Sequence, residues 1–222
     1  RWRMADVFGR PEDFFAASLR KMAGERLLGL NAIRSNPAIV AHSLTGTVDQ
    51  GMTGEGLFTS FRELKPGTVD AVFDGWAPLR WCLFVEPVHF YRGESVHLQA
   101  VLANEDQLTP GEYPAHLQIF GPNNEKVWER STKVRIAAPG SRPEPPFVLP
   151  VLSEAVVIDS PSGKYRFVTS FDQGAAPLGD EVFFHVGDRV EQPLVTGDVV
   201  LWGEDPTLAK WLVERGVTVR TF

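Results

Sequence analysis

The sequence predicts a mainly β, multidomain fragment with an immunoglobulin-like β-sandwich at residues 80–191. We expect this sandwich to follow the last helix, strand and helix of a (β/α)8 barrel, residues 1–79, and to precede an incomplete βαβ unit, residues 192–222. Three observations predict this order. Apolar residues recur every three or four positions before the sandwich, every second position within it, and in a strand–helix–strand pattern after Gln192-Pro193.

The first part of the chain predicts two amphipathic helices. Residues 11–36 have an apolar residue every three or four positions, with Pro11 suited to the first turn and Pro37 forcing a stop. Pro66 can open a second helix, TVDAVFDGWAPL. The apolar stripe predicted on it consists of Val69, Val72, Phe73 and Trp76.

Between these helices, residues 37–44 predict a buried strand that runs into a polar, glycine-rich loop. Ile39, Val40, Ala41, Ser43 and Leu44 are small or apolar, and Gly46, Gly51, Gly54 and Gly56 loosen the backbone that follows. Barrels carry their chemistry on loops at the C-terminal ends of strands. Helix, strand, loop and helix are therefore interpreted as the last strand and loop of a barrel whose earlier strands are missing.

Seven short strands are predicted after the second helix. They cover residues 81–87, 96–104, 113–121, 126–136, 147–158, 164–172 and 181–187. Turn signals such as Pro110-Gly111 and Pro139-Gly140 separate them. Seven strands over about a hundred residues are typical of an immunoglobulin-like sandwich.

The C-terminal segment predicts a strand at DVVLWG, a helix at DPTLAKWLVERG and a strand at VTVRTF. Asp205 suits the N-cap of this helix and Gly216 its end. Two strands and one helix bury too little surface to fold alone. Since the sequence also opens on Arg1 instead of Met, we expect both ends to be cut from a longer protein.

Composition excludes several classes of function. The formal charge of −6 and the lack of a Lys/Arg run oppose nucleic-acid binding. No apolar run approaches the roughly 20 residues that span a bilayer, and the N-terminus lacks the apolar core of a signal peptide. Cys82, the one cysteine, lies in an apolar run and is expected to be a buried thiol. The compartment stays open.

Three segments together resemble the barrel end and the following sandwich of family 2, β-galactosidase-like glycoside hydrolases. They are LTGTVDQGMTGEGLF, KPGTVDAVFDGWAPLRWCLFVEP and VLANEDQLTPGEYPAHLQIFGP. The C-terminal βαβ looks like the start of a flavodoxin-like or amidotransferase-like domain. The resemblance implies that two glutamates, at the ends of the fourth and seventh barrel strands, catalyse the reaction. Both then lie upstream of Arg1, and this chain has no catalytic residue of its own.

Within that resemblance, the loop after residue 44 is predicted to contact a sugar through Thr45, Asp49, Gln50 and Glu55. Their hydroxyl, amide and carboxylate groups suit sugar hydroxyls at a barrel mouth. Asp49 could instead cap a local turn, with Glu55 in water. Trp81 is the tryptophan that could reach the domain interface and stack on a sugar, although tryptophans on apolar faces usually belong to the core.

No cofactor or metal is predicted, since the five histidines lack zinc-site spacing and GMTGEG lacks the Lys-Ser/Thr of a phosphate loop. The expected partners are a carbohydrate, the missing barrel strands and the rest of the C-terminal domain. A non-catalytic sandwich module that binds carbohydrate or protein is the alternative. A stand-alone enzyme with a nucleotide site in the C-terminal βαβ lacks the ribose-binding acid.

Overall fold

A computed structural model describes residues 3–50, 54–138, 140, 148–191 and 197–222 of the chain. They form two compact units, Arg1–Val186 and Gly187–Phe222. Most residues of regular structure are in β-strands, as predicted. Among the described residues, no helix is long and apolar enough to cross a membrane.

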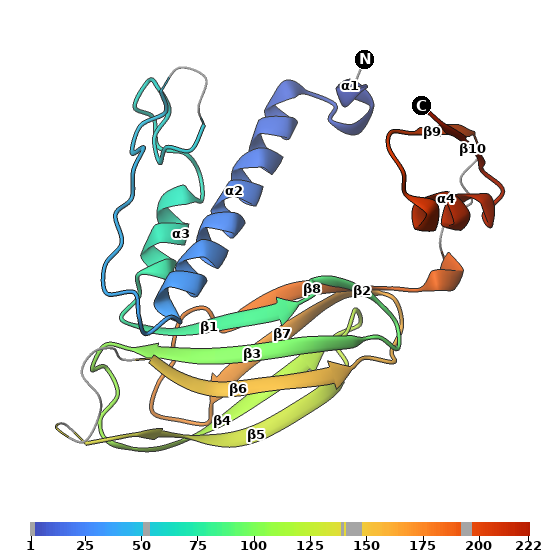
Figure 1. Cartoon of the computed structure of the whole chain (residues 1–222). Helices are drawn as coiled ribbons and strands as arrows, with labels where there is room; N and C mark the ends of the chain where they lie inside the picture. The colour runs from blue at the N-terminus through green and yellow to red at the C-terminus, as the bar shows by residue number, and fades with distance from the viewer. Residues whose placement is uncertain (1–2, 51–53, 139, 141–147, 192–196) are drawn as a thin grey trace. The chain divides into compact units, whose positions relative to one another are not determined.

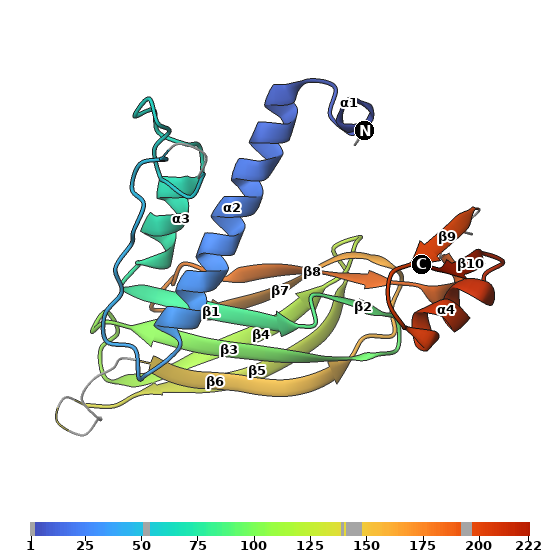
Figure 2. The same ribbon diagram turned by 45° about the horizontal axis from the view of Figure 1, so that its top comes forward.

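The first unit contains a β-sandwich of two sheets, which Figures 1 and 2 show as two layers. The three-stranded sheet has the order β1 (Leu79–Glu86), β3 (Ser95–Asn104) and β6 (Val148–Val157). The five-stranded sheet has the order β2 (His89–Tyr91), β8 (Glu181–Gly187), β7 (Gly163–Phe171), β4 (Gly111–Phe120) and β5 (Lys126–Ile136). All seven predicted strands are confirmed. The sequence prediction missed β2, which has three residues and is too short for an alternating pattern to show.

The two sheets enclose one apolar core. Strand residues alternate between the core and the outer face, as on β3, where Val96, Leu98 and Ala100 are fully buried and His97 is exposed. Phe167 on β7 and Leu117 on β4 close the core from the five-stranded sheet. The period of two in the sequence therefore predicted the face as well as the strands.

Tyr165 fixes the corner that leads into β7. Its hydroxyl donates a hydrogen bond of 2.5 Å to the carbonyl of Pro161, four residues earlier, while its ring is fully buried against Phe184. Burial and the nearby Glu125 carboxylate raise the pKa of this hydroxyl. A tyrosine at this corner, bonded back to the preceding backbone, is a hallmark of immunoglobulin-like sandwiches.

Three helices precede the sandwich: α1 (Met4–Val7), α2 (Pro11–Arg34) and α3 (Thr68–Gly75). The long predicted helix is confirmed by α2. The predicted stripe on α3 is not its buried face: Phe73 is 74% exposed, whereas Thr68, Ala71 and Gly75 are buried. Small residues face α2, because the two helices lie too close together for larger side chains.

The helices α2 and α3 pack side by side and run in the same direction (Figure 1). A Cβ added at Gly67, at the start of α3, would lie 3.7 Å from Ala23 Cβ. One added at Gly75, at its end, would lie 2.3 Å from Cδ1 of Leu30, which is about two turns further along α2 than Ala23. The chain between them, residues 35–67, must therefore run back along the pair.

The strand predicted over residues 37–44 does not form; this segment is irregular. A strand obtains its backbone hydrogen bonds from neighbouring strands, and none lies beside this segment in the described chain. Its apolar side chains are accordingly only partly covered: Val40 is 80% exposed and Leu44 is 39% exposed. The expectation of a buried strand was wrong for this chain.

The second unit has a 3-10 turn, Arg189–Glu191, then β9 (Asp198–Leu201), α4 (Pro206–Val213) and β10 (Thr218–Thr221). The strands β9 and β10 pair in parallel, which confirms the predicted βαβ unit. The side chain of Asp205 caps α4 by accepting from the amide of Leu208 at 2.9 Å. Gly216 has a φ of 79°, the left-handed conformation expected where a helix stops. The predicted start of this domain, residues 192–196, lies outside the described residues.

Candidate functional site

The polar loop after residue 44 folds back on itself. The amide of Asp49 donates to the carbonyl of Phe58 at 2.9 Å, and the amide of Lys65 donates to the carbonyl of Leu57 at 3.0 Å. Single β-bridges join Val48 to Phe58 and Phe58 to Leu64. The loop is thus a small folded element that ends where α3 begins.

Asp49 holds this loop together from inside. Its Oδ1 accepts from Lys65 Nζ at 2.6 Å and from the amide of Gly56 at 2.8 Å, and Lys65 also donates to the carbonyl of Gly54 at 2.7 Å. Both side chains of the ion pair are largely buried. Burial by itself raises the pKa of the Asp49 carboxyl, but the Lys65 and Gly56 hydrogen bonds and the Lys65 charge outweigh it, so the pKa lies below its usual range. Asp49 is therefore an ionised, internally bonded carboxylate.

The other predicted loop residues are at the surface. Thr45, Gln50 and Glu55 are exposed. The Glu55 side chain lies beside Gly46, since a Cβ added there would be 3.0 Å from Glu55 Cγ. The backbone carbonyl of Glu55 accepts a hydrogen bond from Arg26 Nη2 on α2. The loop therefore contacts α2, and its polar side chains are exposed to solvent.

Trp81 lies elsewhere, inside the sandwich. It is 0% exposed, and its ring is 5.2 Å from that of Phe171, centroid to centroid. Stacking on a sugar needs an exposed ring face, which Trp81 does not have in this structure. Its place in the alternation of β1 explains why: Trp81, Leu83 and Val85 all point into the core.

A buried arginine joins the helices to the sandwich. Arg80, the second residue of β1, is 1% exposed. Its Nε and Nη2 donate to Asn31 Oδ1 on α2 at 2.9 and 2.7 Å, and its Nη1 donates to the carbonyl and to Oδ1 of Asp74 on α3 at 2.6 and 3.0 Å. One guanidinium thus ties both helices to the first strand of the sandwich. We call these three residues the Arg80 anchor.

Arg34, at the end of α2, makes a second link. It pairs with Glu105 at 2.7 Å and donates to the carbonyl of Ala77 at 3.1 Å. Cys82 lies nearby in β1 and is fully buried, as predicted. Burial raises the pKa of its thiol against the opposing effect of the Arg80 and Arg34 charges, so this thiol is a core group and not a nucleophile.

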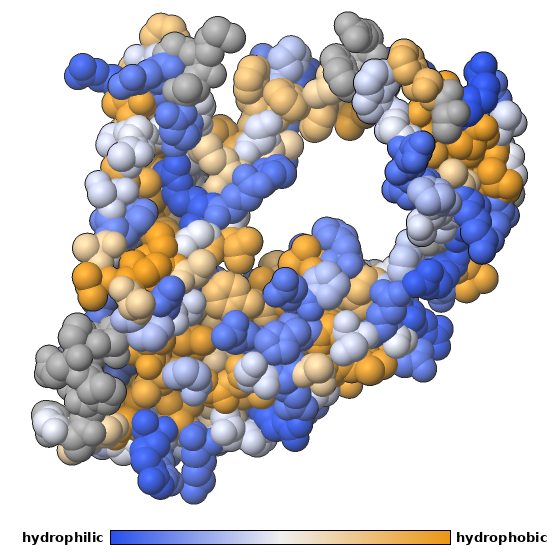
Figure 3. Space-filling view, viewed as in Figure 1, coloured by the Kyte–Doolittle hydropathy of each residue, from blue (hydrophilic) through white to orange (hydrophobic). Residues whose placement is uncertain are grey.

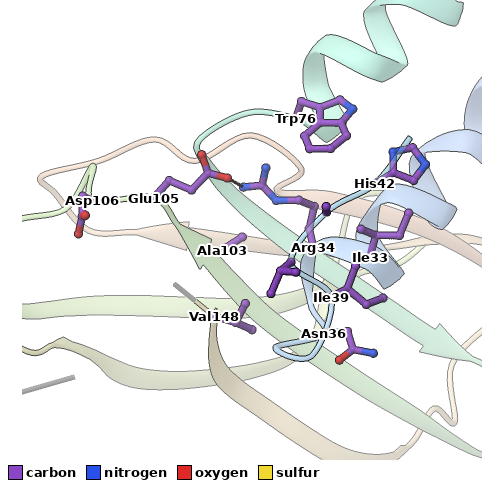
Figure 4. A pocket seen from close by; sticks show the side chains of 12 residues that line it. Ile33, Arg34, Asn36, Ile39, His42, Trp76, Ala103, Glu105, Asp106 and Val148 are labelled. Carbon is purple, nitrogen blue, oxygen red and sulfur yellow. Dashed lines mark ion pairs between the residues drawn. The ribbon is translucent and has the colours of Figure 1, made fainter. Parts of the chain in front are cut away.

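A pocket of about 340 Å³ opens between the end of α2, the segment after it and the sandwich (Figure 4). The ion pair of Arg34 and Glu105 crosses it, and Trp76 lies on the α3 side next to His42, with ring centroids 5.5 Å apart. None of the residues predicted to contact a sugar lines it. The structure therefore separates the predicted loop from this pocket.

In the described residues, no group of three or more His, Cys, Asp or Glu side chains could hold a metal ion. Lys65, Asn31, Asp74 and Arg80 were not predicted from the sequence. A signal for the last of these was present: Arg80 directly precedes the apolar run Trp81–Val85, and a charge beside such a run needs partners if it is buried.

No family model matches the chain, and no curated protein matches it. Solved structures give partial likenesses. A glycosyl hydrolase family 2 member from Bacteroides cellulosilyticus is 23% identical over 50% of this chain, with a TM-score of 0.35. The alkylpurine DNA glycosylase AlkC from Pseudomonas fluorescens is 13% identical, with a TM-score of 0.35. The match covers 55% of this chain and 38% of that protein. The CARDB domain of PF1109 from Pyrococcus furiosus is 12% identical, with a TM-score of 0.34. The match covers 50% of this chain and 86% of that domain's chain.

The match covers 14% of the length of the family 2 hydrolase. The link to that family is therefore weak. At these TM-scores the likenesses assign no function to this chain.

Proposed function

We propose that this chain is part of a glycoside hydrolase, in which α2, residues 37–66 and α3 close a catalytic barrel and the sandwich braces it. The observation that carries the proposal is the parallel packing of α2 and α3, which are joined in the sequence by a segment that returns from the end of α2 to the start of α3. In a (β/α)8 barrel every strand is followed by a helix, so neighbouring helices run parallel and a strand returns between them. Residues 37–44 occupy that position in the chain.

The exposed apolar residues of the helical layer support the same proposal. Val40, Phe73 and Leu28 are each more than half exposed, and Figure 3 shows apolar side chains at the surface of this layer. A barrel strand is buried on both faces. Further strands beside residues 37–44 would cover Val40 and give the segment its missing backbone partners.

The sandwich has the properties of a brace. Its core is complete, and the Arg80 anchor makes four hydrogen bonds to α2 and α3 from the strand where the sandwich begins. A buried guanidinium with four hydrogen bonds to two helices restricts the relative orientation of the parts that it joins. The helices would thereby be held at a fixed angle to the sandwich.

In this proposal the loop after residue 44 faces the sugar. Thr45, Gln50 and Glu55 offer hydroxyl, amide and carboxylate groups to sugar hydroxyls, and the Asp49–Lys65 pair keeps the loop folded. The catalytic acid/base and nucleophile come from barrel strands outside this chain. β-Galactosides are the substrates to test first, on the strength of the sequence resemblance.

Hydrolysis of chromogenic glycosides tests this proposal. We expect the product of the complete reading frame that contains this chain to release nitrophenol from a β-galactoside or another glycoside, and the 222-residue chain to release none. If the complete protein hydrolyses no glycoside, the proposal is wrong.

A non-catalytic module is the second candidate, because the sandwich has a closed core that does not depend on a barrel. Titration of the 222-residue chain with galactosides and glucans separates the two. Saturable binding by the chain, together with an inactive complete protein, would favour the module.

A further inference from the structure

Helix α3 has a second apolar side, which faces away from α2. The buried residues of this helix, among them Ala71 and Gly75, face α2. Phe73 is two positions from each of them, and a helix turns by about 100° per residue, so Phe73 lies about 200° around the axis. It is 74% exposed, and Val69 and Trp76, four positions before it and three after it, are exposed as well. Large apolar side chains therefore lie on the side of α3 that α2 does not cover.

Phe73 forms a ridge between two hollows. One, of about 840 Å³, lies between α3 and the loops that follow β3 and β7, where Leu108 and Leu178 line it. The other, of about 440 Å³, lies between α3 and Ala23 on α2, and Leu178 lines it too. Helices pack by placing the ridges of one into the grooves of another, so this surface fits the side chains of one further helix. Residues 37–44 line neither hollow.

Asp70 determines the charge beside this surface. It is exposed and lines the smaller hollow, and in the described part of the chain no ion pair joins it to a basic side chain. The carboxylate of Asp74, one turn further on, is already paired with Arg80. A lysine or arginine at the edge of an incoming surface would pair with Asp70, whereas an acidic residue would be repelled. The second side of α3 therefore suits an apolar surface with a basic edge.

The position of α3 indicates which surface this is. Contiguous exposed apolar side chains mark a contact with another protein surface. In a (β/α)8 barrel the helices form an outer ring, so each helix lies between two others. If the chain closes such a barrel, α2 is one neighbour of α3, and the other neighbour is a helix from the part of the barrel outside this chain.

We propose that Val69, Phe73 and Trp76 dock an amphipathic helix of the same polypeptide, the first helix of the barrel ring, and that this helix also contacts the sandwich at Leu178. This inference rests on the proposed function and adds to it the partner of α3. The docked helix has an apolar residue every three or four positions, which fill the hollows on either side of Phe73, and a lysine or arginine beside Asp70.

The docked helix gives the sandwich a second attachment to the barrel. The Arg80 anchor holds α2 and α3, the last two helices of the ring, to the sandwich. Leu178, from the loop after β7, contacts the first helix. The sandwich then bridges the seam at which the barrel closes.

Thiol labelling tests whether this side of α3 is covered. In Phe73→Cys we expect a maleimide to react at least tenfold more slowly in the product of the complete reading frame than in the 222-residue chain, because the docked helix covers the position. Val157→Cys is the matched control: Val157 is an exposed apolar residue of β6, and its rates in the two proteins should be equal. The native thiol, Cys82, is fully buried, so its reaction reports unfolding.

Photo-crosslinking identifies the occupant. We replace Phe73 by p-azidophenylalanine, which keeps the aromatic ring, and locate the crosslink by digestion and mass spectrometry. In the complete protein we expect an intramolecular crosslink to a segment outside residues 1–222 that has an apolar residue every three or four positions. A crosslink to a second copy of the protein, or to residues 187–222, would overturn the assigned occupant.

Equal labelling rates of Phe73→Cys in the two proteins would overturn the docking face. Equal slowing at positions 73 and 157 would do so too, because it would reflect general shielding by a larger protein. Glycoside hydrolysis by the same complete protein separates this inference from the proposed function. Hydrolysis with rapid labelling at position 73 refutes the docking face alone, whereas slow labelling without hydrolysis refutes the hydrolase and supports the docking face.

Discussion

Replacing Arg80 by Met should destabilise the first unit more than any surface substitution. Methionine keeps most of the length and apolar volume of the side chain, but removes the charge and the four hydrogen bonds to Asn31 and Asp74. Removing one partner of a buried charged network costs about 3–5 kcal/mol. Because the Asp74 side chain is 32% exposed and can be rehydrated, we expect about 3 kcal/mol, at the lower end of that range.

Urea unfolding at neutral pH, followed by circular dichroism and tryptophan fluorescence, measures this loss. Arg92→Met is the matched control: Arg92 also pairs with an aspartate, Asp159, but both side chains are largely exposed. Such a pair contributes about 0–1 kcal/mol. If Arg80→Met changes the free energy of unfolding no more than Arg92→Met does, the Arg80 anchor does not hold the helices to the sandwich and the reasoning is refuted.

Three further predictions concern local contacts. Tyr165→Phe should lower the free energy of unfolding by about 1 kcal/mol, because the corner loses one hydrogen bond; no change in urea midpoint would contradict it. Gly75→Ala should lower the free energy of unfolding by about 1–3 kcal/mol, since the added Cβ would overlap Leu30 of the opposing helix. Gly24→Ala, which has open space around it, should raise the free energy of unfolding by about 0.5–1 kcal/mol. If both substitutions change it in the same direction, the close packing at Gly75 is refuted. The pKa of the Asp49 carboxyl is lowered in the folded chain from an ordinary 3.8. The ion pair with Lys65 should therefore stabilise the loop fully above that pH and less as the pH drops through the folded-state pKa. Amide exchange of the loop, measured against pH, checks this, and the same pH profile in Asp49→Asn would contradict it.

The sandwich could be predicted because its information is local. Several strands alternate in polarity, β1 is a short apolar run, and glycine or proline lies in the turns, so the strands could be predicted from short windows of sequence. The pattern on β3 is an example: Val96, Leu98, Ala100 and Leu102 predict the strand and its core face together. The C-terminal βαβ unit was predictable for the same reason, through Asp205 and Gly216.

Where partners are distant in sequence, the sequence prediction failed. Residues 37–44 have the composition of a strand, but a strand forms only when neighbours supply hydrogen bonds, and composition does not show whether they are present. On α3 the spacing of the apolar residues predicted the wrong buried face, because the close approach of α2 determines which face is buried. Gly75, a residue without a side chain, marks that face.

The candidate site shows the same division. Thr45, Gln50 and Glu55 were predicted to contact a sugar from a polar loop; they are exposed loop residues, and the sugar contact stays a prediction. The partner of Asp49 was not foreseen, because Lys65 is 16 residues further on, beyond the glycine-rich turn. Asn31 and Asp74 could not be assigned to Arg80 either, since the contact depends on how two helices pack on a strand.

The most direct test of the account is amide hydrogen exchange over residues 39–44, in the 222-residue chain and in the product of the complete reading frame. In the proposed hydrolase this segment is the closing strand of a barrel that other parts of the protein complete. It predicts rapid exchange in the chain, where these amides lack strand partners, and strong protection in the complete protein. Equally rapid exchange in both would contradict it.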